Sequence, residues 1–148
     1  MQALNFPNYS FRIKNSQNRQ YIFDPVRKKF VLLHPEEWVR QHLLQFLVLD
    51  KGYPMGLINV ERQLLVNQLK KRYDLVVFHP DGSIFLLVEC KAPLVAIDQG
   101  TFDQIARYNL QLKARFLVVT NGLDHYCCEL DHPNEKYRFL REIPDFSR

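Results

Sequence analysis

Two nearly continuous apolar runs occur in the chain, at residues 73–78 and 84–91. Runs of this length that are rich in Val, Leu, Ile and Phe predict strands. The intervening residues, His-Pro-Asp-Gly-Ser, are typical of a tight turn, so the two strands should form a β-hairpin. A strand exposed on one face would alternate apolar and polar residues, so we expect this sheet to be covered on both faces.

Apolar residues at helical spacing predict two helices, over residues 35–49 and 99–114. Pro35 suits the first position of the first helix, and the side chains of Glu36 and Glu37 suit the positive end of its dipole. These helices are the natural cover for the two faces of the sheet.

A third buried strand is predicted at residues 115–120, directly after the second helix. The order strand, helix, strand requires a crossover and implies at least one parallel pairing. Further strands and a strand-rich lead-in are predicted at residues 57–67, 125–130, 137–142 and 9–33. We therefore expect a single α/β domain over residues 1–148, with a central mixed sheet between helices.

The composition excludes several classes of protein. Of the 148 residues, 47% are apolar and 24% are charged, which is too apolar for a disordered chain. No apolar run approaches the roughly 20 residues that span a bilayer. The N-terminus lacks a basic region followed by an apolar stretch, so we expect no secretory signal. The three cysteines, two of them adjacent, do not fit a disulfide framework. We expect a cytoplasmic protein with no membrane partner.

The net charge of +4 permits a polyanionic partner and does not require one. Basic residues cluster at residues 27–29 and 70–72. We expect the cluster at 27–29 to be a solvated part of the surface.

The end of the second apolar run carries candidate chemistry. Glu89 and Lys91 are two residues apart and so share one face of the strand, with Cys90 on the other. In a hairpin with an even loop, Asp74 lies opposite Glu89, with Cβ atoms roughly 4.5–5.5 Å apart. Carboxylates this close repel each other unless one is protonated or a cation lies between them. We expect Mg²⁺, with Mn²⁺ as a substitute, and the Cys90 carbonyl as a further ligand.

A second hairpin register remains open. A three-residue loop with a bulge would oppose Asp74 to Val88 and turn Glu89 to the other face. A second bulge would then be needed to bring the two carboxylates together.

Lys91 lies one pleat beyond Glu89. An ammonium group there would orient a nucleophile or stabilise charge that develops on a phosphate. Alternatively, Asp74, Glu89 and Lys91 form a structural ion-pair network, and spacing alone favours neither interpretation.

Other residues are candidates for the same site. Gln104 and Tyr108 lie four residues apart on one face of the second helix, where they would reach the end of the sheet or form a hydrogen bond at the rim of the helix. Glu36 falls on the apolar stripe of the first helix and is a candidate acid, with Glu37 as the fallback. Glu61 is a further candidate ligand, although a surface position fits it equally well.

Asp74 followed by the Glu89-Cys90-Lys91 triplet resembles the PD-(D/E)xK nuclease superfamily. Tyr73 stands where the superfamily motif has proline. The resemblance implies a restriction-endonuclease-like α/β/α sandwich and Mg²⁺-dependent hydrolysis of phosphodiester bonds in DNA. It makes Asp74 and Glu89 metal ligands and Lys91 the catalytic lysine.

The Gln104-x-x-x-Tyr108 pattern is similar to an extension found in one branch, the N-terminal nuclease domain of type I restriction enzyme R subunits. Glu36, four residues before Arg40, fits the opening helix of that branch, and residues 116–122 resemble its following strand. The resemblance implies that Gln104 and Tyr108 assist in the site or contact DNA.

Type I R subunits carry motor domains after their nuclease domain. For this chain we expect motor or specificity subunits to be supplied by other chains, and the oligomeric state is open. Two alternatives to an endonuclease are a non-catalytic DNA-binding or protein-docking module of the same fold, and a structural protein.

Overall fold

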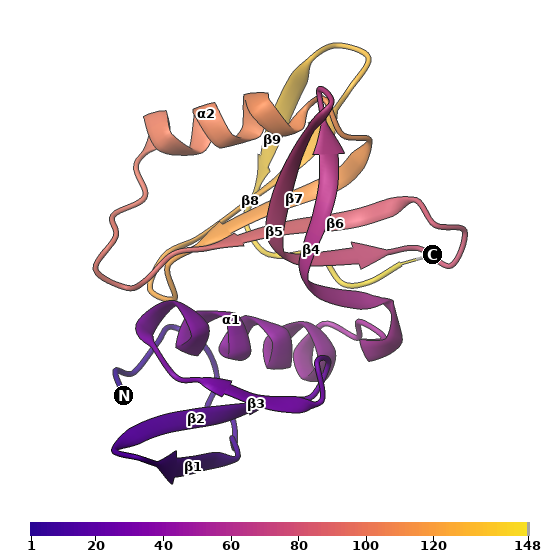
Figure 1. Ribbon diagram of the computed structural model, residues 1–148. Helices are drawn as coiled ribbons and strands as arrows, with labels where there is room; N and C mark the ends of the chain where they lie inside the picture. Colours follow the sequence, from indigo (N-terminus) through magenta and orange to yellow (C-terminus); the bar gives the residue numbers. More distant parts are fainter. Residues whose placement is uncertain (148) are drawn as a thin grey trace.

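The computed structural model describes residues 1–147, and Figure 1 shows their arrangement. In chain order the elements are β1 (Ile13–Ser16), β2 (Arg19–Asp24), β3 (Lys29–Leu32), α1 (Pro35–Gln45), a π-helical turn (Phe46–Asp50), a 3-10 turn (Met55–Leu57), β4 (Ile58–Val66), β5 (Leu69–Phe78), β6 (Ile84–Cys90), α2 (Gln99–Asn109), β7 (Ala114–Thr120), β8 (His125–Asp131) and β9 (Lys136–Leu140).

The central sheet is mixed, as predicted. Its six strands lie in the order β4-β5-β6-β7-β8-β9. β6 and β7 are parallel, and every other neighbouring pair in this sheet is antiparallel. α2 forms the crossover between the two parallel strands. The α/β fold class with a central mixed sheet is therefore confirmed.

The sheet lies between α1 and α2, so both of its faces are buried (Figure 1). Leu43 of α1 and Val88 of β6 belong to one core, which we call the α1-side core. Phe102 of α2 and Leu87 of β6 belong to the other, the α2-side core. Because Leu87 and Val88 point into opposite cores and are both fully buried, β6 has no polar face.

The strand-rich lead-in forms a separate antiparallel sheet, in the order β1-β2-β3. This N-terminal sheet lies on the side of α1 away from the central sheet (Figure 1). Ile22 and Asp24 on β2 are fully buried, and Gln41 of α1 donates a hydrogen bond to Asp24 Oδ2 at 2.9 Å. α1 is therefore packed between two sheets.

Two element boundaries differ from the predictions. α2 ends at Asn109 and not at residue 114, because the Asn109 side chain bonds the Ile105 carbonyl at 2.8 Å and a turn follows. Leu112 extends the apolar pattern but packs on the α2-side core from that turn. β5 starts at Leu69 and not at residue 73, because its polar first residues pair with β4. Neither α1 nor α2 is long and apolar enough to cross a membrane.

Shortening Leu43 to alanine should lower the free energy of unfolding by about 2–5 kcal/mol, because it leaves a cavity in the α1-side core. The matched control is Leu49→Ala, since Leu49 is 64% exposed, and it should change stability by less than about 0.5 kcal/mol. Urea denaturation measures both values, and equal effects would contradict this account of the core.

Candidate functional site

The β5–β6 hairpin has the register that brings Asp74 and Glu89 to the same end of the sheet. Leu75 pairs with Val88, and this register holds toward the turn as far as Val77. A bulge follows Val77, beside the turn. It changes the pairing only at Phe78, so the residues before it keep the register that the even-loop hairpin predicts. Asp74 and Glu89 are the next residues beyond the Leu75–Val88 pair.

Asp74 also lies at a break in the alternation of β5. Tyr73 belongs to the α2-side core and Leu75 to the α1-side core, although a regular strand would place both on one face. Across from Asp74 on β4, Glu61 has a positive φ of 55°, and the ladder of paired residues skips these two positions. This irregularity directs the Asp74 carboxylate toward α1, which the sequence pattern did not predict.

The two oxygens of Asp74 have different partners. Arg40 Nη1 of α1 donates to Oδ1 at 2.9 Å, and the Cys90 backbone N–H donates to Oδ2 at 2.8 Å. Burial raises the pKa of Asp74, and the negative charges of Glu36 and Glu89 raise it further, against the lowering effect of Arg40 and the Cys90 N–H. Burial is thus the main reason why Asp74 is a weaker acid than an exposed aspartate.

Glu89 is held from the other side of the sheet. Its side chain is nearly buried and forms an ion pair with Lys71 of β5. The Lys71 ammonium lies 5.0 Å from the ring centres of both Tyr73 and Tyr108. Tyr108 of α2 therefore lies next to the cation that binds Glu89, and its role in the site stays a prediction.

Arg40 connects Asp74 to a buried network at the start of α1. Glu37 Oε2 accepts from Arg40 Nε at 2.9 Å, and Glu37 Oε1 accepts from Arg27 Nη2 at 2.9 Å. Burial by itself would raise the pKa of Glu37, but the hydrogen bonds and charges of the two arginines outweigh it and lower the pKa to about 2. Glu37 is thus a structural carboxylate that stays charged at neutral pH.

The expectation that residues 27–29 form a solvated cluster is wrong for Arg27. Its side chain is only 16% exposed, and Nε lies 2.7 Å from Asp24 Oδ2. Asp24 Oδ1 also accepts the backbone N–H of Val26 and of Arg27, both at 2.8 Å. These bonds fold the β2–β3 turn back, which brings the guanidinium over the start of α1.

The structure distinguishes the acids that the sequence left as alternatives. The Glu37 carboxylate is bound by Arg27 and Arg40. The Glu36 side chain is half-buried, forms no hydrogen bond with a described residue, and contributes its charge to the surroundings of Asp74. Glu61 lies 3.4 Å from Arg27 and 3.6 Å from Arg40, so it belongs to the rim of the network. The assignment of Glu36 as a site acid stays a prediction.

Lys91 follows β6 and continues its parallel ladder, because its backbone N–H donates to the Thr120 carbonyl at 2.8 Å. Its half-buried side chain forms no ion pair within residues 1–147. The Cys90 thiol is buried in the α1-side core, and burial raises its pKa well above the usual range. The Gln104 side chain is exposed and forms no hydrogen bond with the described residues. The predicted roles of Lys91, Gln104 and the Cys90 carbonyl stay predictions.

Within residues 1–147, no three His, Cys, Asp or Glu side chains are clustered closely enough to form a complete metal site by themselves. Arg40 and Lys71 hold the two carboxylates instead. Sequence reasoning noticed Arg40 only as a motif position and missed Lys71 as the partner of Glu89. The one available signal for Lys71 was its place in a basic run on the strand beside Glu89.

Glu37→Gln should lower the free energy of unfolding by roughly 3 kcal/mol at pH 7, because the pKa of Glu37 falls from 4.5 in the unfolded chain to about 2 in the folded one. This stabilisation is complete above the unfolded pKa and is lost as the pH falls through the folded pKa. The difference from wild type should therefore shrink between about pH 5 and pH 2. Urea denaturation across this range measures it.

The control for that series is Glu142→Gln, because Glu142 is 81% exposed and its contact with Lys51 is a surface pair. It should match wild type throughout. A Glu37→Gln deficit that does not vary with pH would contradict the charged state assigned to Glu37.

Comparison with known proteins gives a family. The family described as type I restriction enzyme R protein N terminus matches residues 35–144. No curated protein matches the chain. A fragment structure described as an HsdR subunit of a type I restriction enzyme from Vibrio vulnificus YJ016 is similar in fold, with a TM-score of 0.50 and 21% identity over 76% of this chain. This chain spans only 24% of that structure. Because the family match extends over most of its length, the chain belongs to the family of type I restriction enzyme R protein N-terminal regions.

Proposed function

We propose that this chain is a Mg²⁺-dependent DNA endonuclease that hydrolyses phosphodiester bonds. The observation that carries the proposal is the hairpin register, which brings Asp74 and Glu89 to one end of neighbouring strands. Lys91 lies two residues after Glu89, just beyond the end of β6, and has no ion-pair partner within the described residues. Membership of the R-protein family supports the same reading.

The donor atoms are of the type that a hard divalent cation prefers, and Arg40 and Lys71 hold the two carboxylates from opposite faces of the sheet. Asp74 and Glu89 supply carboxylate oxygens, which Mg²⁺ prefers, and Glu36 adds a third negative charge nearby. The two side chains already bind cationic groups, Arg40 and Lys71, so this end of the sheet attracts positive charge. A bound Mg²⁺ would polarise the scissile phosphate and lower the pKa of a coordinated water.

The chain's own residues would act around that ion. Asp74 and Glu89 would hold it, and the Cys90 N–H would keep one oxygen of Asp74 oriented. The Lys91 ammonium would bind a nonbridging phosphate oxygen and stabilise its growing charge. Tyr108 and Gln104 would line the approach of the DNA from the α2 side. Glu37 and Arg27 would position Arg40 without touching the substrate.

In this proposal, partner chains select the DNA sequence that is cut. The family is that of type I restriction enzyme R proteins, so we infer that the chain acts with motor or specificity subunits. The candidate site itself offers carboxylates and a lysine, which recognise phosphate and metal and not base sequence.

A second function is favoured by one observation. Because Arg40 and Lys71 already neutralise Asp74 and Glu89, the site would be stable without metal, as in a binding module that does not cleave. The two functions differ in whether a cation displaces these side chains.

Wild-type protein should nick or linearise supercoiled plasmid in Mg²⁺ or Mn²⁺, and Asp74→Asn and Lys91→Ala should each lower the initial rate at least about 100-fold. Asparagine keeps an acceptor for the Cys90 N–H but loses the charged contact with Arg40, so circular dichroism checks that each variant is folded. Lys113→Ala removes an exposed lysine away from the site and should cut at the wild-type rate. Cutting that persists in both site variants would overturn the assignment, and DNA binding by an inactive wild type would select the binding module.

Divalent cations should also stabilise the folded protein. With a dissociation constant of about 1 mM, about 10 mM Mg²⁺ adds roughly 1.4 kcal/mol, which corresponds to a rise in Tm of about 3 °C. Asp74→Asn and Glu89→Gln should abolish this rise in differential scanning fluorimetry, while Glu142→Gln should keep it. An undiminished rise in both site variants would place the ion elsewhere.

A further inference from the structure

The positive charge of this protein is concentrated in its N-terminal segment. Residues 1–33 contain six basic residues and one acidic residue, whereas residues 34–148 contain 14 basic and 15 acidic residues. The whole net charge of +4 therefore comes from the segment that forms the N-terminal sheet. This segment precedes residues 35–144, to which the family model applies.

The N-terminal sheet has one buried and one outward face. Ile22 and Asp24 of β2 point toward α1 and are fully buried, so Tyr21 and Phe23 point outward. Lys14 pairs with Tyr21, which places Lys14 on the outward face as well.

Three exposed cations share this outward face. The Phe23 N–H donates a hydrogen bond to the Arg12 carbonyl at 2.9 Å, which places Arg12 beside Phe23. Arg19 is two residues from Tyr21 on β2, so its side chain points to the same face. We call this surface the basic face and define it by Arg12, Lys14 and Arg19. None of the three forms an ion pair with a residue in 1–147, in contrast to Arg27 in the same sheet.

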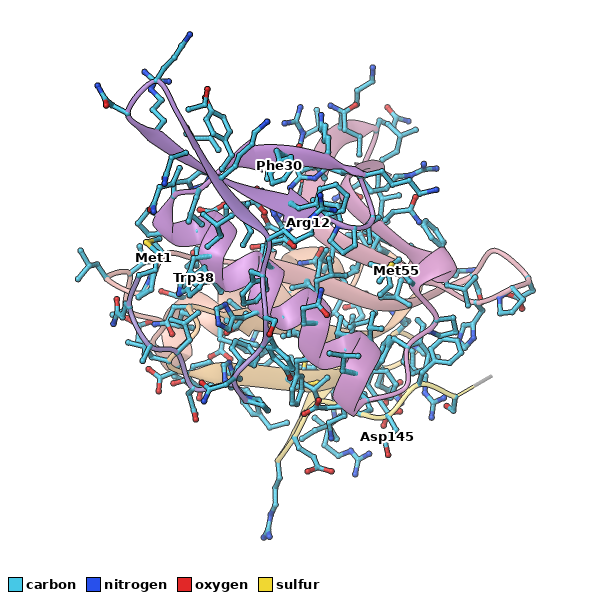
Figure 2. The ribbon with its side chains drawn as sticks, turned by 90° about the horizontal axis from the view of Figure 1, so that it is seen from below. Met1, Arg12, Phe30, Trp38, Met55 and Asp145 are labelled. Carbon is cyan, nitrogen blue, oxygen red and sulfur yellow. The ribbon has the colours of Figure 1, made fainter. Side chains whose placement is uncertain are left out.

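Aromatic rings hold two of these cations in place. The Arg12 guanidinium lies 4.5 Å from the centre of the Phe23 ring and 5.5 Å from that of Phe30. The Lys14 ammonium lies 4.5 Å from the Phe30 centre. Figure 2 shows Arg12 beside Phe30 on this side of the molecule. A side chain that is already restrained loses less entropy when it binds a ligand.

We propose that the basic face binds the phosphate backbone of duplex DNA, independently of base sequence. The choice of DNA rests on the proposed function, but the binding itself does not require cleavage. Unpaired, exposed and restrained cations are suited to phosphates, whose neutralisation releases condensed counterions. A protein partner would instead need an apolar centre to its interface, and on this face the cations lie over Phe23 and Phe30.

The basic face is connected to the candidate site through one turn. The β2–β3 turn carries the exposed Lys28 next to Arg27, and Arg27 contacts Glu37 and Glu61 beside Asp74. The β2–β3 turn therefore borders both the N-terminal sheet and the end of the central sheet where the acids gather.

The test is fluorescence anisotropy with a labelled duplex of unrelated sequence, in EDTA so that no cleavage occurs. The variant Arg12→Gln/Lys14→Gln/Arg19→Gln should reduce the slope of log K against log salt by about 3, which is about 1 per lost phosphate contact. Its affinity at about 50 mM KCl should fall at least tenfold. The same triple variant should keep the Mg²⁺-dependent rise in Tm, which separates this proposal from the cleavage site.

The charge-matched control is Lys113→Gln/Lys136→Gln/Arg141→Gln, whose three residues are exposed and unpaired within the described chain. It should keep the wild-type slope. A second variant, Arg19→Gln, leaves both ring contacts intact and should lower the slope by about 1, so the test does not depend on variants that lose the ring contacts of Arg12 and Lys14.

Equal losses of DNA affinity in the basic-face variant and its control would show that binding depends only on net charge, and would overturn the proposal. Wild-type DNA binding by the basic-face variant would also overturn it, and would leave an acidic protein as the partner of this face. Loss of binding together with normal circular dichroism and a normal salt slope in the control would support it.

Discussion

The buried guanidinium of Arg40 is the interaction on which the arrangement of the candidate site depends. It contacts Glu37 within α1 and Asp74 on β5, so it joins the helix to the strand at the point where β5 changes face. A buried charge is tolerated only with close partners, and removing one partner from a buried pair costs about 3–5 kcal/mol. The position of the Asp74 carboxylate is therefore linked to the packing of α1.

The same electrostatics bear on function. Arg40 and Lys71 approach the acids from opposite faces of the sheet, one from α1 and one along β5. Each cation compensates a carboxylate that would otherwise repel its neighbour across the hairpin. A divalent ion would have to compete with both contacts at once, so the strength of these ion pairs sets how tightly metal can bind.

The sequence predicted those features that depend on local chemistry. Unbroken apolar runs predicted a sheet buried on both faces, and the order around residues 84–120 predicted the parallel pair. It could not predict the change of face at Asp74, because this depends on the conformation of Glu61 on another strand. It ranked Glu36 above Glu37 but could not predict that Arg27 binds Glu37, since Arg27 comes from a turn in another part of the chain.

The Asp24 carboxylate has a consequence for the limits of the folded unit. It binds Arg27 within its own turn and Gln41 on α1, and so anchors the N-terminal sheet to the helix that carries Arg40. The similarity to the family begins at residue 35, so this boundary separates Asp24 and Arg27 from the residues of α1 to which they are bonded. A relative whose chain lacked this lead-in would need another positive group beside the acid at position 37, since that position here shares its charge between two arginines.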